Sequence, residues 1–281
     1  MKIKKLLVAL LALSLFVFAA ACGQKPATEQ PQGEGEKKEV VLKVGATPVP
    51  HAEVLRAAIP LLAAKGIKLE VVEFTDYATP NTALAQKDLD ANYFQHVPYL
   101  EDFSKENKLD LAWTVKVHFE PLGVYSQKIK ALDELKDGAT IAVPNDTTNE
   151  ARALLLLQDN GLIKLKADAG ISATKNDIIE NKKNLVIEEL EAAQIPRALP
   201  DVDAAVINAN YALDAKLSPA TDAIVAEGKD SLAADTYGNI VAIRKGDENR
   251  PEIKALNEAL TSPEIKKFFE DTYKGAVVPT F

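Results

Sequence analysis

Residues 40–74 read VVLKVGATPVPHAEVLRAAIPLLAAKGIKLEVVEF. Two runs rich in valine, leucine and isoleucine, 40–45 and 67–74, have the composition of strands. Between them, residues 52–65 have the spacing of a helix, which Pro60 should kink. A strand, a helix and a second strand in this order form the unit from which mainly parallel sheets covered by helices are built. The segment therefore predicts an α/β protein.

The same alternation continues to the C-terminus in two blocks. The first block predicts strands at 91–94, 109–117 and 122–126 and helices at 81–87 and 97–107. The second predicts strands at 140–144, 185–190, 204–207 and 238–244, helices at 149–160 and 211–216, and two helices within 251–274 that break at 262–263. Two α/β lobes are expected, and open α/β sheets bind ligands beyond the carboxyl ends of their strands.

The N-terminal segment has the parts of an export signal. Three lysines among residues 2–5 precede an apolar stretch, 6–21, that only Ser14 interrupts. This stretch is shorter than the ~20 residues that a membrane-spanning helix needs, although an uncleaved anchor helix is the alternative. The only cysteine, Cys22, follows three alanines, which resembles a bacterial lipobox with Ala19 in place of a larger aliphatic residue. We predict a signal peptide over 1–21 and lipidation at Cys22.

Residues 22–39 have the composition of a flexible tether. Beyond the cysteine they contain no large apolar side chain, so they cannot contribute to a core. A coil of about 17 residues spans roughly 20–25 Å root-mean-square, enough to hold a folded body just off a membrane. The net charge of −8 becomes −11 once the three lysines of the signal are removed. Such an acidic chain is a poor nucleic-acid binder, and a single cysteine excludes an internal disulfide and cysteine-rich zinc sites.

Common catalytic motifs are absent from the sequence. It contains no G-x-S-x-G, H-E-x-x-H, G-x-x-x-x-G-K-[ST] or G-x-G-x-x-G. With Cys22 assigned to the anchor, no cysteine nucleophile remains. Carboxylate pairs such as 133/134 and 188/189 have the surroundings of a solvated surface. We therefore predict a binding protein with no catalytic residues, and keep as the alternative a lipid-anchored hydrolase or transferase that acts on an amino-acid derivative.

One segment joins a predicted strand to a predicted helix and carries an unusual cation. Residues 143–152 read VPNDTTNEAR, in which Thr147 and Glu150 have the spacing of a capping box. A helix N-terminus favours anions, and Arg152 adds positive charge there. This suggests a carboxylate partner from outside the segment. The alternative is an ion pair with a surface acid.

Histidines and aromatic residues gather near predicted strand ends. The three histidines, His51, His96 and His118, could ligate Zn²⁺ together with Glu120, but no two of them are close in sequence. The alternative is that they are neutral rings that line a cleft. The aromatic residues near strand ends are Tyr77, Tyr93, Phe94, Phe119 and Tyr211. An aromatic cleft with one arginine suits a small carboxylate that has an apolar tail.

Several runs resemble, in order, the methionine-binding lipoproteins of the NlpA family, which deliver methionine to an ABC importer. These runs are TPVPHAEVL at 47–55, FTDY at 74–77, PNTAL at 80–84, DANYFQHVPYL at 90–100, EPLGVYS at 120–126, VPNDTTNEARALLLLQ at 143–158 and AVINANYA at 205–212. The resemblance covers about residues 42–281. It implies a two-lobed fold of the type II periplasmic-binding-protein class with the ligand cleft between the lobes.

The resemblance also implies the domain division and the place of action. Residues 40–128 and 236–281 would form one lobe, and residues 129–235 the other. The protein would bind methionine without a cofactor, on the extracytoplasmic face of the cell membrane. It would deliver its ligand to the permease and ATPase of an importer. A methionine-containing dipeptide or a metal ion is the alternative ligand.

The same resemblance assigns roles to individual residues. It implies that Arg152 pairs with the ligand carboxylate, and that Asn149 and Asn208 hydrogen-bond the amino-acid head. The side-chain pocket would be walled by Tyr77, Tyr93, Phe94, His96 and His118.

Overall fold

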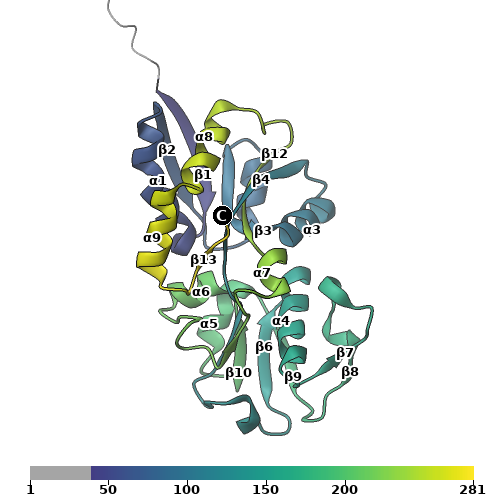
Figure 1. Cartoon of the computed structure of the whole chain (residues 1–281). Helices are drawn as coiled ribbons and strands as arrows, with labels where there is room; N and C mark the ends of the chain where they lie inside the picture. The colour runs from purple at the N-terminus through teal and green to yellow at the C-terminus, as the bar shows by residue number, and fades with distance from the viewer. Residues whose placement is uncertain (1–38) are drawn as a thin grey trace, which may run out of the picture. The chain divides into compact units, whose positions relative to one another are not determined.

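The computed structural model describes residues 39–281, so the predicted signal peptide, Cys22 and nearly all of the tether lie outside the described residues. Two sheets carry the fold, and their strands alternate with helices along the chain (Figure 1). Among residues 39–281, no helix combines the length and the apolar character needed to cross a membrane.

The first sheet has six strands in the order β13-β4-β12-β3-β1-β2. Their bounds are β1 Val40–Ala46, β2 Ile67–Glu73, β3 Ala91–His96, β4 Leu111–Phe119, β12 Asn239–Arg244 and β13 Val278–Pro279. Strand β1 pairs in parallel with β2 and β3, but β12 is antiparallel to both β3 and β4. The expectation of a mainly parallel sheet is therefore wrong here. The reason is that β12 comes from the far end of the chain and enters the sheet in the opposite direction.

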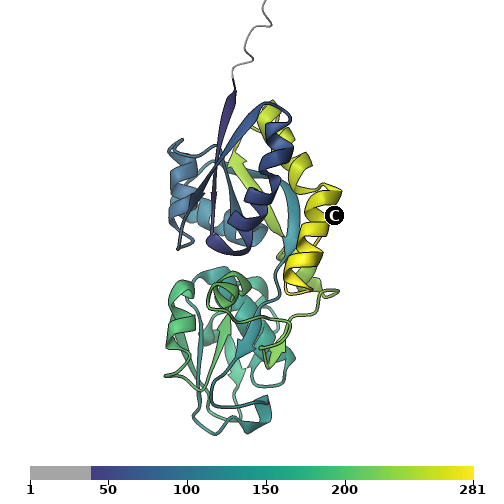
Figure 2. The same cartoon turned by 90° about the vertical axis from the view of Figure 1, so that its left-hand side faces the viewer.

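Helices cover both faces of the first sheet. These are α1 Glu53–Ala63, α2 Thr79–Ala85, α3 Val97–Asn107, α8 Pro251–Leu260 and α9 Pro263–Tyr273. Helices α1, α8 and α9 pack together on one face (Figure 2). Alternate residues of β12 point to opposite faces of the sheet. Val241 packs in the core beneath α1. Its neighbour Ile240 packs on the other face, with Leu84 of α2 and Leu100 of α3. This is the two-residue period of a strand that is buried on both sides.

The second sheet has five strands in the order β11-β5-β10-β6-β9. Their bounds are β5 Gly123–Tyr125, β6 Thr140–Pro144, β9 Val186–Leu190, β10 Ala204–Ile207 and β11 Val225–Ala226. Strands β10, β6 and β9 are parallel to one another, whereas β5 pairs antiparallel with both β10 and β11. The helices around it are α4 Thr147–Asp159, α5 Ile195–Ala198, α6 Ala209–Asp214 and α7 Leu232–Thr236, and a separate hairpin joins β7 Lys164–Leu165 to β8 Ile178–Glu180.

The crossing between the two sheets differs from the predicted boundary. A boundary at residue 128 puts β5 in the first lobe. The hydrogen bonds of β5 to β10 and β11 place it in the second sheet instead. The chain therefore crosses between the end of β4 and the start of β5, and it returns between β11 and β12.

Candidate functional site

A cavity is lined by elements of both sheets. Its walls include residues at or just beyond the carboxyl ends of strands: Phe94 and His96 of β3, Glu120 after β4, Asn149 and Arg152 of α4 after β6, and Asn208 after β10. The chain thus places its polar groups where open α/β sheets bind ligands.

Aromatic rings form one part of the wall. The ring of Tyr77 lies 4.9 Å from that of Tyr211, 5.7 Å from that of Tyr99 and 5.8 Å from that of Phe94, all between centroids. The Tyr77 hydroxyl donates to Asn210 Oδ1 at 2.5 Å, which ties the first sheet to α6. Such rings offer an apolar, polarisable surface to a ligand.

A chain of hydrogen bonds runs along the polar part of the wall. Asn208 Nδ2 donates to Asn149 Oδ1 at 2.9 Å, and His96 Nε2 donates to the same oxygen at 3.2 Å. The Asn149 amide in turn donates to the Asp146 carboxylate. His96 Nδ1 accepts from the backbone N–H of Tyr99, so the ring proton belongs on Nε2. Burial lowers the pKa of His96 to about 3, and the charge of Arg152 acts in the same direction, so the ring is neutral.

One atom of this chain stands out. Asn208 Oδ1 is buried and has no hydrogen-bond partner among residues 39–281. Buried polar atoms in folded proteins almost always have a partner, because an unpaired one costs about 1–3 kcal/mol. Because Asn208 lines the cavity, this oxygen is an acceptor available within the site.

Helix α4 is capped differently from the prediction. The N-cap is Asp146, whose carboxylate accepts from the backbone N–H of Asn149 at 3.0 Å. The predicted partner of Thr147, Glu150, accepts instead from the backbone N–H of Lys175. The capping box is therefore wrong, because an aspartate one residue earlier already satisfies the helix terminus.

Arg152 is buried and paired with an acid of the protein itself. Its Nε donates to Glu227 Oε1 at 2.8 Å and its Nη2 to Glu227 Oε2 at 2.5 Å, while Nη2 also donates to the carbonyl of Glu120. The side chains of Arg152 and Glu227 are only 4% and 8% exposed. The alternative of an ion pair with a surface acid is therefore correct about an acid of the protein but not about its exposure. The ring of Tyr237 lies 4.3 Å from the guanidinium carbon. Within residues 39–281, no hydrogen bond uses Nη1 of Arg152.

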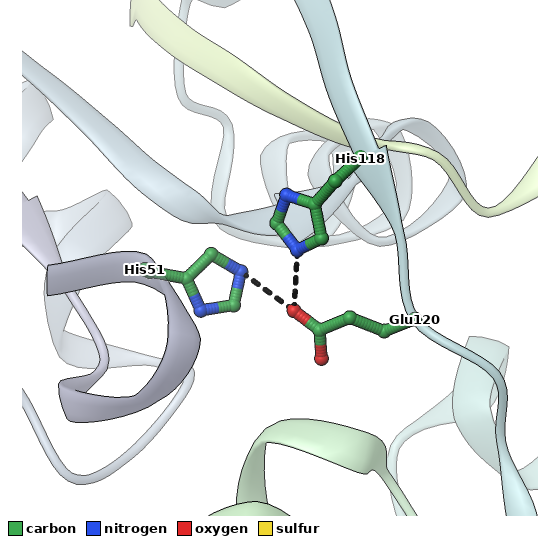
Figure 3. A group of neighbouring side chains, drawn as sticks. All are labelled: His51, His118 and Glu120. Carbon is green, nitrogen blue, oxygen red and sulfur yellow. Dashed lines mark hydrogen bonds and ion pairs between the residues drawn. The ribbon is translucent and has the colours of Figure 1, made fainter. Parts of the chain in front are cut away.

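Three titratable side chains lie close together at the cavity wall: Glu120, which lines the cavity, and His51 and His118 behind it (Figure 3). Glu120 Oε1 lies 2.6 Å from His118 Nε2 and 3.1 Å from His51 Nε2. The Tyr93 hydroxyl forms a hydrogen bond with His118 Nδ1. Tyr93 and His118 therefore do not line the cavity as expected. They lie one layer behind Glu120, which lines it in their place.

The metal alternative can be tested on this group. The donor atoms of His51, His118 and Glu120 lie within 4.8 Å of one another. Each ring nitrogen, however, has a partner within the protein: besides the contacts above, His51 Nδ1 lies 2.7 Å from Thr47 Oγ1, and His51 Nε2 lies 3.0 Å from Asn239 Oδ1. These separations are those of hydrogen bonds. The arrangement is accounted for as a hydrogen-bond network, so we do not propose a metal site.

The network keeps Glu120 ionised. Burial opposes ionisation, but attraction to His51 and hydrogen bonds from His118 and His51 outweigh it and hold the pKa of Glu120 below its usual range. Burial lowers the pKa of His118 to about 4 against the opposing effect of Glu120, so this ring is neutral near pH 7. A buried carboxylate thus faces the cavity beside a neutral imidazole.

Most of the residues named from the sequence meet at the cavity. Its lining includes Arg152, Asn149, Asn208, Tyr77, Phe94 and His96. The lining also includes five residues that sequence reasoning did not assign to a ligand pocket: Gln95, Tyr99, Glu120, Asn210 and Asn239. Four of these stand inside or beside the quoted runs at strand ends, a signal that could have found them. Nothing in the sequence around Glu227 distinguishes it from other acids.

Known proteins share this architecture over nearly its whole length. The family described as NlpA lipoprotein matches residues 42–281. The methionine-binding lipoprotein MetQ of Bacillus subtilis is 44% identical over 280 residues, 98% of each chain. A nutrient-binding protein from Burkholderia cenocepacia bound to methionine has a TM-score of 0.82 at 48% identity and covers 85% of this chain and 100% of its own. An ABC transporter periplasmic substrate-binding protein from Coxiella burnetii has a TM-score of 0.81 at 43% identity, with coverage of 85% and 100%.

Proposed function

Because the chain belongs to the NlpA lipoprotein family, we propose that it is a solute-binding protein that captures methionine and supplies it to an ABC transporter. The relative from Bacillus subtilis is named for methionine binding, and the structure from Burkholderia cenocepacia holds methionine. Both are covered almost completely by this chain at 44% identity or more. The function is binding and delivery, not catalysis.

The observation that carries the choice of ligand is the unpaired Oδ1 of Asn208 in the cavity wall. An ammonium group can donate to this oxygen and to the nearby ionised Glu120. The ligand carboxylate would accept from Nη1 of Arg152, the nitrogen that Glu227 does not occupy. An α-amino acid carries both groups on one carbon.

The side-chain end of the cavity supports methionine among the amino acids. We assign the thioether to the aromatic wall formed by Tyr77, Phe94 and Tyr99. A sulfur atom against an aromatic ring contributes roughly 0.3–1.5 kcal/mol per contact. A polar side chain of equal length, such as that of glutamine, would instead lose its hydrogen bonds with water without new partners on these rings.

Two contacts support closure of the lobes over the ligand. His96 of β3 donates to Asn149 of α4, and Tyr77 before α2 donates to Asn210 of α6. Each joins an element of the first sheet to one of the second. In this proposal the lobes are divided at the crossings between β4 and β5 and between β11 and β12, and opening there admits methionine.

Thermal unfolding with added ligand tests the choice of methionine. The protein should first be unfolded and refolded, so that co-purified ligand is removed. At 100 times its dissociation constant, methionine should then stabilise the fold by about 2.7 kcal/mol, whereas glutamine should have little effect. No shift with methionine, together with a shift from Zn²⁺ that EDTA reverses, would favour the metal alternative.

The proposal also includes a lipid anchor that attaches the protein to the membrane. We infer that residues 1–21 are removed, that Cys22 carries the lipid and that 22–39 tether the body at the extracytoplasmic face of the cell membrane. A Cys22→Ala variant should move from the membrane to the soluble fraction. Retention of this variant in membranes at high salt would mean that the apolar N-terminus is itself a transmembrane helix.

The transporter partner is proposed to be a complex of permease and ATPase. With that complex in proteoliposomes, this protein loaded with methionine should raise the rate of ATP hydrolysis, and heat-denatured protein should not. An unchanged rate would contradict delivery to that importer.

A further inference from the structure

A chain of buried side chains stands behind Glu120. Thr47 Oγ1 contacts His51 Nδ1 at 2.7 Å, both histidines contact Glu120 Oε1, and Tyr93 closes the chain at His118. The four supporting side chains are at most 1% exposed. They come from the segment that follows β1, from β3 and from β4, so three separate segments of the first lobe converge on one carboxylate oxygen.

The geometry leaves the second oxygen of Glu120 for the cavity. Both imidazole contacts use Oε1, and no hydrogen bond among residues 39–281 uses Oε2. Figure 3 shows Oε2 directed away from both rings. A carboxylate that is held at one oxygen by two donors cannot rotate freely, so the direction of the other oxygen is determined as well.

The charges around the cavity make this oxygen a site for a cation. Arg152 has its matching anion in Glu227, with which it forms two hydrogen bonds. Glu120 has no guanidinium or ammonium partner among residues 39–281: imidazoles hold its Oε1, Arg152 reaches only its backbone carbonyl, and its Oε2 makes no hydrogen bond. A buried carboxylate gains stability from a positively charged donor, because charge-assisted hydrogen bonds are the stronger ones.

We propose that His51 and His118 are positioning residues for recognition of the ligand's ammonium group, because they hold Glu120 Oε1 and so aim Oε2 at that group. The inference rests on the proposed function and specifies its ligand class, free α-amino compounds. Analogues without a charged amino group bind more weakly, because they cannot donate to Glu120. The thioether end is recognised elsewhere, at the aromatic wall.

The test compares methionine with 4-(methylthio)butanoate, which is methionine without its amino group. Calorimetric titrations would use refolded wild type, Glu120→Gln, His118→Phe and His51→Gln. We expect Glu120→Gln to bind methionine at least about 30-fold more weakly, as truncation of a buried charged hydrogen bond does. The histidine variants should lose about 10-fold, as is typical of residues that orient a binding group. Affinity for the amino-free analogue should change by no more than about threefold in all three, given the uncertainty of such substitutions.

A control variant and a milder variant complete the experiment. Thr114→Val removes a hydrogen bond to Asn257 elsewhere in the first lobe and should change neither affinity. Should His118→Phe fail to fold, Tyr93→Phe removes only the hydroxyl that contacts His118. It should weaken methionine binding a few-fold and leave the analogue unaffected.

The outcomes separate this inference from the proposed function. Equal losses for both ligands in the histidine variants, or no loss for either, would show that the histidines do not act through the ammonium, and would overturn the inference alone. Wild-type protein that binds neither ligand would overturn the proposed function itself.

Discussion

Two carboxylates lie near Arg152, one of them on the cavity wall, and the protein holds them in different ways. Glu227 meets the guanidinium of Arg152 with both oxygens, so each charge has its counterpart inside the protein. Glu120 lines the cavity and is held at one oxygen by His118 and His51, and no hydrogen bond among residues 39–281 uses its other oxygen. In the first arrangement both carboxylate oxygens have partners, whereas in the second one oxygen makes no hydrogen bond among residues 39–281.

This difference suggests different roles for the two carboxylates. Glu227 belongs to an ion pair within the protein, and Glu120 is the one that we propose to contact the ligand. A buried ion pair adds little net stability over a well-packed apolar pair, but removing one partner costs about 3–5 kcal/mol. Arg152 is therefore expected to support the fold of the site, and in the proposed function it also contacts the ligand carboxylate. Glu120, by contrast, has one oxygen without a hydrogen bond among residues 39–281, and we propose that the ligand's ammonium group donates to it.

The largest effect is expected from Arg152→Ala, which breaks the complete pair. The buried Glu227 would lose its partner, so the free energy of unfolding of the ligand-free protein should fall by about 3–5 kcal/mol. Loss of the contact from Nη1 should also weaken methionine binding by two to four orders of magnitude. Arg152→Lys should recover only part, because an ammonium cannot reproduce the planar two-pronged contact.

Calorimetric titration and urea unfolding would measure both effects of these Arg152 variants. Wild-type affinity in Arg152→Ala would mean that the guanidinium does not touch the ligand, and that Glu227 is its only partner.

A second variant, Glu227→Gln, removes the negative charge that pairs with Arg152. Arg152 would keep a hydrogen-bond acceptor but lose its counter-charge, so the ligand-free protein should be destabilised by about 1–3 kcal/mol. The ligand carboxylate would then supply the missing charge. The methionine-induced rise in melting temperature should therefore exceed that of wild type. A smaller rise than in wild type would contradict the placement of the ligand carboxylate at Arg152.

The dependence of stability on pH probes the neutral rings beside the charged groups. His96 and His118 have folded pKa values of about 3 and about 4, below the ordinary 6.5, so the unfolded chain takes up protons that the folded chain does not. Their contribution is present above pH 6.5 and is lost as the pH falls, by about 1.4 kcal/mol per pH unit for each ring.

Urea unfolding at pH 7, 6 and 5 would measure this loss. His96→Gln keeps a donor for Asn149 but cannot titrate, so its stability should fall less steeply with pH than that of wild type. Equal slopes would mean that His96 is protonated in the folded protein.

The smallest effect is expected from Tyr77→Phe, which leaves both charged groups intact. The variant loses only the hydroxyl that donates to Asn210, a hydrogen bond that contributes about 0.5–1.5 kcal/mol. Because the ring remains, contact with the thioether is retained and methionine affinity should fall by no more than about tenfold. A larger loss, measured by calorimetry, would place this hydroxyl in direct contact with the ligand.

Sequence reasoning reached much of the fold and part of the site. Strands and helices were predictable because the period of apolar residues is a local property, as in β1, α1 and β2. The quoted runs identified Arg152, Asn149 and Asn208, which all line the cavity. The mixed sheet was not predictable, because β12 pairs with strands more than a hundred residues earlier in the chain. No local sequence pattern indicates that β12 lies between β3 and β4.

The sequence by itself determined the family and the order of the elements. Only the tertiary structure decided which side chains are partners. It joined Arg152 to Glu227, 75 residues away, and it set Tyr93 and His118 behind Glu120 rather than on the cavity wall. The physical reason is that apolar periodicity acts over a few residues, whereas ion pairs, hydrogen bonds and the burial that shifts a pKa depend on groups that meet only when the chain has folded.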